Sequence, residues 1–186
     1  MSLTSRYEEA FVLTADLHRE QQRKGSGVPY VSHLLAVSAT VIEHGGDEDE
    51  AIAGLLHDAV EDQGGAETRE RIRERFGDRV TAIVDGCTDT DVIPKPPWRE
   101  RKEAFIESLR DASESVHLVV AADKLHNSRS TLADYRQIGN DVWALFQGRR
   151  DGTLWYFRSV AERLDKAPER LVDQLRRVVL ELESSI

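Results

Sequence analysis

The sequence is poor in cysteine, in strand-forming patterns and in long apolar runs. Its 186 residues include one cysteine, Cys87, which excludes a disulfide framework within the chain and favours a reducing setting. No apolar run approaches the roughly 20 residues that cross a membrane. The first twenty residues are charged and amphipathic, unlike a secretory signal. We therefore expect a cytoplasmic protein with no membrane partner.

Positive charge is also scarce. The 34 acidic and 25 basic side chains give a formal net charge of −9, whereas nucleic-acid-binding proteins usually have a broad basic surface. Hydrophobic residues make up 40% of the chain and charged residues 32%, which is typical of a globular protein. We expect no nucleic-acid partner, and an anionic ligand would have to be held by a local basic cluster or a metal ion.

Apolar residues recur at helical spacing along almost the whole chain. Short segments rich in Gly, Pro and Asp separate these amphipathic stretches, and alternating strand patterns are nearly absent. The length and this pattern predict an all-α fold of about eight to ten helices in one domain, 1–186, with a motif-bearing core at about 7–135 and C-terminal helices at 141–186 packed on it. The predicted helices are 4–22, 30–44, 47–62, 67–75, 79–86, 98–110, 114–135, 141–146, 153–164 and 168–183, with a loop at 87–97.

Three predicted helices carry ionisable residues where apolar ones would be expected. His57 and Asp58 follow an apolar run, Asp123 follows another, and His33 lies on an otherwise apolar helix. Burying such groups is costly unless something pairs with them, and a divalent cation is one such partner. Taken singly, each has an ordinary explanation: a salt-bridged helix end, a buried Asp that caps a neighbouring helix or pairs with an Arg, and a core histidine with satisfied hydrogen bonds.

Taken together, these residues favour a metal site. His33, His57, Asp58 and Asp123 make a mixed nitrogen and oxygen set that suits Mn²⁺, Fe²⁺ or Zn²⁺ and leaves positions for water. An open site of this kind is typical of catalysis, because a bound divalent ion makes a water molecule acidic near neutral pH. His126 lies three residues after Asp123, so it could also approach that carboxylate.

The segments around these residues form an ordered set over about residues 7–135. They are His18 with Gln21-Gln22-Arg23-Lys24, Pro29-Tyr30-Val31-Ser32-His33, Leu55–Asp62, Phe76-Gly77 and Ala122–Asn127. The order resembles the metal signature of HD phosphohydrolases, and the segments resemble the hydrolase domain of RelA/SpoT proteins. The chain is too short for the synthetase and regulatory domains of long RelA/SpoT proteins, so it resembles a stand-alone small alarmone hydrolase.

The resemblance implies a reaction and a cofactor. A protein of this kind removes the 3′-pyrophosphate of guanosine tetra- and pentaphosphate, (p)ppGpp, by metal-activated water with Mn²⁺. The products are GDP or GTP and pyrophosphate. The resemblance also implies that the partner is a small nucleotide substrate, while the sequence does not distinguish a monomer from a homodimer.

The resemblance further implies roles for individual residues. His33, His57, Asp58 and Asp123 would hold the metal, and Glu61 and Asp62 would orient and deprotonate the attacking water. Residues implied to contact the substrate are Arg23, Lys24, Asn127, Arg150 and Tyr156. From the residues alone, Glu61 lies one turn after His57 and Asp58 on the predicted helix, a position suited to a general base.

Two alternatives remain open from the sequence. An HD phosphatase acting on the 2′-phosphate of NADPH, on a nucleoside monophosphate or on an adenine alarmone would use the same metal site. A non-catalytic module could instead bind a nucleotide without turnover. The Glu61-Asp62 pair argues against such a module, because a binding protein has no need of a base.

Overall fold

The structure is a computed structural model that describes residues 2–185. Over these residues the chain forms nine α-helices and one 3₁₀-helix, with no β-strand, which confirms the all-α prediction. The elements are α1 (Ser5–Leu17), α2 (Val31–Glu43), α3 (Glu48–Leu56), α4 (Ala59–Asp62), α5 (Gly65–Cys87), α6 (Trp98–Ser108), α7 (Glu114–Ile138), η1 (Gly139–Leu145), α8 (Arg149–Arg163) and α9 (Glu169–Ser184). No helix in this part of the chain is long and apolar enough to cross a membrane.

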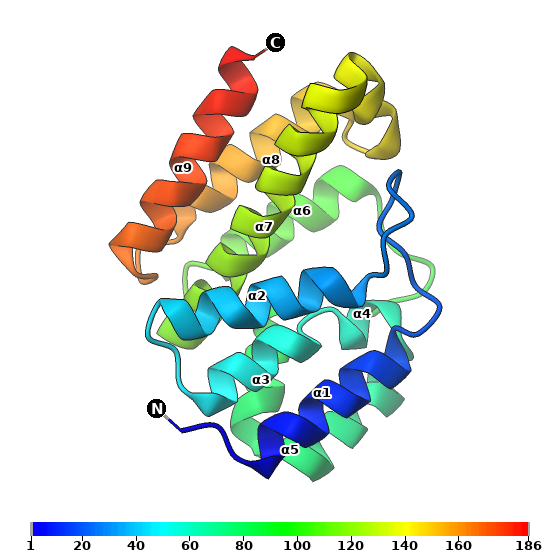
Figure 1. Ribbon diagram of the computed structural model, residues 1–186, viewed down its shortest axis with the longest axis vertical. Helices are drawn as coiled ribbons and strands as arrows, with labels where there is room; N and C mark the ends of the chain where they lie inside the picture. Colours follow the sequence, from blue (N-terminus) through cyan, green and yellow to red (C-terminus); the bar gives the residue numbers. More distant parts are fainter. Residues whose placement is uncertain (1, 186) are drawn as a thin grey trace.

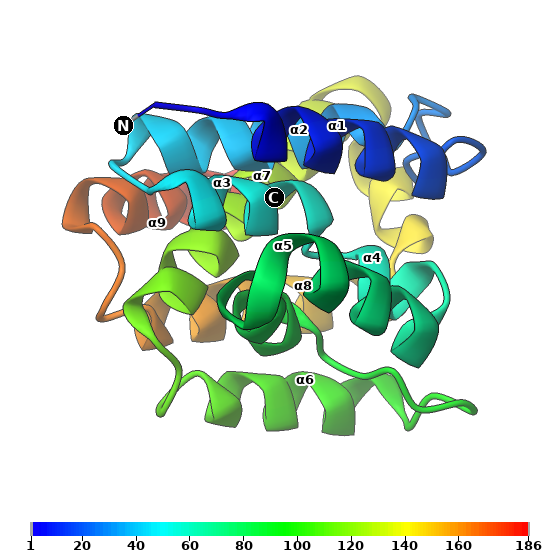
Figure 2. The same cartoon turned by 90° about the horizontal axis from the view of Figure 1, so that it is seen from below.

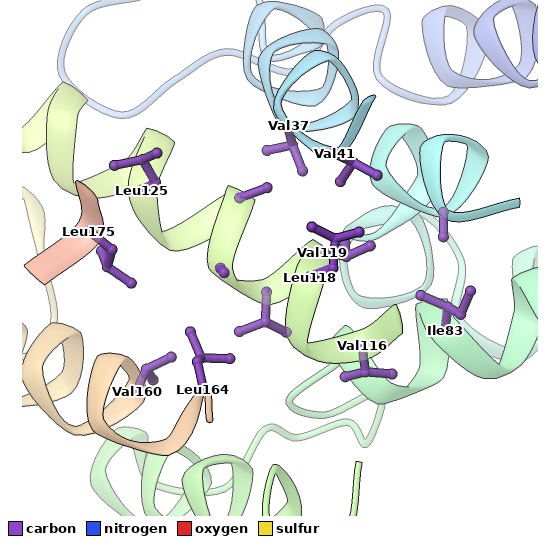
Figure 3. Packing of buried hydrophobic residues seen from close by; sticks show 14 of the residues in the cluster. Val37, Val41, Ile83, Val116, Leu118, Val119, Leu125, Val160, Leu164 and Leu175 are labelled. Atoms are coloured by element: carbon purple, nitrogen blue, oxygen red, sulfur yellow. The ribbon is translucent and has the colours of Figure 1, made fainter. Parts of the chain in front are cut away.

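The long helix α7 runs through the middle of the molecule. It packs on α2, α3 and α5 at one side and on α8, α9 and η1 at the other (Figure 1). Its segment Leu118–Ala122 is buried at every position, because a helix that is apolar on all sides has to be covered on all sides. Figure 3 shows this segment meeting Val37 and Val41 of α2, while Val160 of α8 and Leu164, the residue after α8, lie on its other side. The apolar centre predicted from the sequence is therefore the axis of the core.

The N-terminal helices form one end of the molecule. Helices α1 and α2 lie along one face of the molecule, and α6 lies along the opposite face (Figure 2). Helix α3 packs against α1, α2 and α5, so it is covered from three directions. An Asp47–Glu50 capping box begins α3.

The structure corrects predicted helix boundaries at two important places. The first helix ends at Leu17 and not at Gln22, and the following loop is closed by a bridge between Gln22 and Pro29. The helices predicted at 67–75 and 79–86 are confirmed as two helical segments, which together form α5 and meet at a kink at Gly77, where the backbone is non-helical with a φ of 86°. A positive φ suits glycine, which has no Cβ to clash with the backbone.

The second correction concerns the segment that carries His57 and Asp58. The sequence predicts a continuous helix to Asp62, but α3 ends at Leu56 and α4 begins at Ala59. His57 donates from Nδ1 to the carbonyl of Gly54 (2.9 Å), so its imidazole folds back on the last turn of α3. The break between the two helices leaves His57 and Asp58 where the apolar run of α3 meets the acidic residues of α4.

Candidate metal centre and active site

Four residues that the sequence singles out lie together in the structure. His33 comes from the first turn of α2, His57 and Asp58 from the break after α3, and Asp123 from the middle of α7. Ligand atoms of His33, His57 and Asp58 lie within 4.8 Å of one another. The Oδ1 atom of Asp123 lies 3.2 Å from Nε2 of His33 and 3.7 Å from Nε2 of His57. We refer to these four residues as the His/Asp cluster.

The two histidines of the cluster have buried Nε2 atoms without hydrogen-bond partners. Oδ2 of Asp58 lies 3.0 Å from Nε2 of His57 and 3.6 Å from Nε2 of His33, but not in hydrogen-bonding geometry. A buried polar atom without a partner is costly, so this arrangement needs a further group. Two imidazole nitrogens and two carboxylates facing one another are a donor set that suits a divalent transition metal.

His117 shows what a structural histidine looks like in the same fold. It is as buried as His33, but both of its ring nitrogens are used. Nε2 donates to the carbonyl of Leu109 (2.8 Å), and Nδ1 accepts from the backbone N–H of Lys166 (3.3 Å). The ordinary explanation of a satisfied core histidine therefore fits His117 and does not fit His33 or His57.

Burial and charge act in opposite directions on the cluster. Burial alone lowers the pKa of His57, but the adjacent carboxylates of Asp58 and Asp123 hold that pKa well above its ordinary value. Burial raises the pKa of Asp58, but His57 and His33 hold it well below its ordinary value. The carboxylates are therefore ionised and surround the histidines with negative charge, which favours a cation at this position.

Both carboxylate oxygens of Asp123 are held by residues of α7. Lys124 donates to Oδ2, and Asn127, one turn further along the helix, donates to Oδ1. Burial raises the pKa of Asp123, but Lys124 and the two histidines hold it well below its ordinary value. Arg23, from the loop after α1, donates to the amide oxygen of Asn127 (3.0 Å). This chain of contacts connects the first loop to the cluster.

Glu61 lies on the one-turn helix α4 and pairs with a lysine. Its Oε1 atom lies 2.8 Å from Nζ of Lys95, in the loop before α6. Burial and the charge of Asp89 raise the pKa of Glu61, while Lys95 and Lys102 lower it. The net shift is upward, which moves this carboxylate towards the range in which a general base operates.

Asp62 is held by an amide network. Gln21 donates from Nε2 to Oδ2 of Asp62 (2.8 Å). The Oε1 atom of Gln21 lies within hydrogen-bond distance of His18 Nδ1 and accepts from Gln63 (2.8 Å). Partial withdrawal from water and the nearby charge of Asp58 raise the pKa of Asp62. The acidic pair thus consists of two carboxylates with raised pKa values, each fixed by a different neighbour.

The residues expected to contact substrate are not all in one place. Tyr156 is buried on α8, and its ring lies 5.3 Å from Nζ of Lys124 and 4.8 Å from Nζ of Lys102, so it is one residue removed from Asp123. Lys24 is exposed in the loop after α1. Arg150 is exposed and lines a surface cavity with Trp155, Arg158 and Glu183, a cavity whose lining includes no member of the His/Asp cluster.

Sequence reasoning missed several residues that contact the cluster. Tyr30 donates its hydroxyl to Oδ2 of Asp58 (2.7 Å). His126, noted only for its spacing from Asp123, instead lies with its Nδ1 2.8 Å from Nδ1 of His33. Tyr30 lies one turn before His33, so helical spacing could have indicated that it lies near the cluster. No such spacing relates His126 to His33.

Known proteins of several kinds are similar to this sequence. The guanosine-3′,5′-bis(diphosphate) 3′-pyrophosphohydrolase MESH1 of Xenopus tropicalis is 40% identical over 124 residues, which cover 65% of this chain and 66% of the frog protein. The GTP pyrophosphokinase of Streptomyces coelicolor is 39% identical over 124 residues, 66% of this chain and 14% of the bacterial protein. The chain therefore spans just under two thirds of the first relative and a small part of the second.

Solved structures are similar over more of the chain. A structure described as a metazoan orthologue of SpoT that hydrolyses ppGpp superposes with a TM-score of 0.83 at 28% identity, covering 97% of both chains. A Listeria monocytogenes protein superposes with a TM-score of 0.71 at 30% identity, covering 82% of this chain and 99% of the other. The HD domain family matches residues 10–154, which include every member of the His/Asp cluster. The chain belongs to the HD domain family.

Proposed function

We propose that this protein is a metal-dependent pyrophosphohydrolase that removes the 3′-pyrophosphate of (p)ppGpp and leaves GDP or GTP. The observation that carries the chemistry is the pair of buried, unpaired Nε2 atoms of His33 and His57 facing the carboxylates of Asp58 and Asp123. The substrate class is supported by the likeness, over 97% of both chains, to a protein described as hydrolysing ppGpp.

The His/Asp cluster would hold the metal, with Mn²⁺ as our choice. His33 and His57 would each offer Nε2, and Asp58 and Asp123 would each offer a carboxylate oxygen. A divalent cation bound there would supply Lewis-acid stabilisation of phosphoryl oxygens and lower the pKa of a water molecule. The carbonyl of Gly54 fixes the proton of His57 on Nδ1, which leaves Nε2 as a lone-pair donor.

Glu61 and Asp62 would manage the proton of the attacking water. Each has a raised pKa, and each is held by one neighbour, Lys95 for Glu61 and Gln21 for Asp62. A carboxylate whose pKa is raised towards neutrality is a better proton acceptor than one at its ordinary value. The two residues would divide the work between accepting the proton and orienting the water.

Basic residues would offset the charge of the substrate. We assign the phosphates to Arg23 and Lys24, while Asn127, which is bonded to Arg23, would contact the ribose or orient Asp123. The ammonium groups of Lys102 and Lys124 lie over the ring of Tyr156, the other proposed substrate contact. In a chain with a net charge of −9, this local concentration of cations is what a polyphosphate ligand requires. Arg150 is also proposed to contact the substrate, and the family resemblance alone supports that proposal.

A substrate panel tests this proposal. The purified protein with Mn²⁺ would be given ppGpp, pppGpp, ppApp, NADPH and GMP, and the products would be separated by anion-exchange chromatography. We expect pyrophosphate together with GDP or GTP from the guanosine alarmones. Inorganic phosphate from NADPH or GMP without turnover of ppGpp would overturn the substrate assignment. Binding of ppGpp without any turnover would overturn the assignment as an enzyme.

A further inference from the structure

The imidazole of His126 lies against the imidazole of His33. Their Nδ1 atoms are 2.8 Å apart, and their ring centroids are 4.8 Å apart with planes inclined by 43°. His33 has no exposed surface, whereas His126 is partly exposed. The Nε2 atom of His33 faces Asp58 and Asp123. Its other ring nitrogen, Nδ1, faces His126.

This contact controls where His33 carries its proton. Two Nδ1 atoms 2.8 Å apart form a hydrogen bond only if one is protonated and the other is not. When His33 donates from Nδ1, its Nε2 is a free lone pair directed at the cluster. When His126 donates instead, a neutral His33 carries its proton on Nε2, and that nitrogen cannot bind a cation.

The two histidines of the cluster are supported in different ways. The Nδ1 atom of His57 donates to a backbone carbonyl, that of Gly54, which no substitution removes. The Nδ1 atom of His33 depends on a side chain, which a substitution does remove. Metal-binding histidines generally need a partner on their second nitrogen to fix the tautomer and the ring orientation.

We propose that His126 is a positioning residue that accepts the Nδ1 proton of His33 and so keeps Nε2 of His33 available to the metal. The proposal rests on the proposed function, because it takes the His/Asp cluster as the metal site. His126 is not itself a ligand in this account, and its effect is on metal affinity.

The test compares two substitutions of nearly equal size. In His126→Asn the amide oxygen takes the place of Nδ1 and still accepts a proton, whereas His126→Leu fills the same space with no acceptor. We would measure the Kd of the metal-free proteins for Mn²⁺ from the electron paramagnetic resonance signal of free Mn²⁺, after circular dichroism has shown that both are folded. We expect the Asn variant to bind like the unchanged protein and the Leu variant about 10–100-fold more weakly.

Two further proteins make each outcome interpretable. His44→Ala removes a histidine at the opposite end of α2 from His33, whose ring nitrogens bond to the carbonyl of Thr40 and to the side-chain amide of Gln174, and it should leave the Kd unchanged. His57→Ala should lose binding. Equal Kd values for the Asn and Leu variants, with binding lost in His57→Ala, would overturn this inference alone. Retained binding in His57→Ala would overturn the proposed metal site itself.

Discussion

Gly54 of α3 lies directly against Ser38 of α2. A Cβ atom placed on Gly54 would come within 3.0 Å of the Cα atom of Ser38 and 3.3 Å of its backbone nitrogen. The Ser38 hydroxyl donates to the carbonyl of Ala51 (2.8 Å), which ties the two helices together at this point. Because α2 carries His33 and α3 leads directly into His57, this close contact helps to set the separation of the two histidines.

Substituting Gly54→Ala tests the importance of that contact. Helix propensity alone predicts that alanine stabilises an interior helical position by about 1 kcal/mol relative to glycine. We expect the opposite, because the added methyl meets backbone atoms of Ser38 that cannot swing aside. The melting temperature of the metal-free protein should fall, and Mn²⁺ should bind more weakly. A higher melting temperature with unchanged Mn²⁺ affinity would show that the contact between α2 and α3 accommodates a methyl group at residue 54.

The charges around Glu61 predict opposite effects of two substitutions on pH dependence. Glu61 must be ionised to accept a proton, so its pKa sets the acidic limb of the profile of kcat/KM against pH. Asp89 raises this pKa and Lys95 lowers it. Lys95→Met should therefore move the acidic limb to higher pH, and Asp89→Asn should move it to lower pH. Movement of both in one direction would assign the limb to another group.

The two acidic residues of α4 can be separated by neutral substitutions. Glu61→Gln and Asp62→Asn each remove a carboxylate without removing the cluster, so both variants should still bind Mn²⁺. The residue that accepts the proton should lose about 10²–10⁴-fold in kcat, and the residue that orients the water should lose less. If kcat measured at saturating Mn²⁺ and substrate falls less than tenfold in both variants, neither residue is the base.

The placement of Tyr156 and Arg150 predicts different effects on substrate binding. Tyr156 lies beside Lys124, which pairs with Asp123, whereas Arg150 lies with Trp155 and Glu183 in a separate surface cavity. Tyr156→Leu should raise the KM for ppGpp clearly more than Arg150→Gln does. The measurement is the KM of each variant for ppGpp by steady-state kinetics, after its melting temperature has shown that it is folded. A larger effect of Arg150→Gln would return that arginine to the substrate site.

Local spacing predicted part of this site and could not predict the rest. Asn127 lies four residues after Asp123 on one regular helix, so both share a face and their hydrogen bond is a contact that helical spacing can predict. The break between α3 and α4, at His57 and Asp58, was missed, because the apolar pattern of α3 continues into α4 without a helix-breaking residue. The apolar run before Asp123 is visible in the sequence, and in the structure it is buried at every position.

Contacts between distant segments account for what the sequence left out. His33 and His126 are 93 residues apart, and Tyr30 and Asp58 are 28 residues apart. No helical period connects such positions, so their contacts follow only from how α2 packs on α3 and α7. The assembly of the four cluster residues was expected from the family resemblance and not from spacing, for the same reason.

The most direct test of the central claim is the release of pyrophosphate from ppGpp by the metal-free protein supplied with Mn²⁺. Mg²⁺ and EDTA serve as controls, and His57→Ala is assayed in parallel with a Mn²⁺-binding measurement on each protein. We predict pyrophosphate and GDP in equal amounts, dependent on added Mn²⁺ and lost together with metal binding in His57→Ala. Undiminished release by His57→Ala, or release in EDTA, would contradict the assignment of the His/Asp cluster as the catalytic metal site.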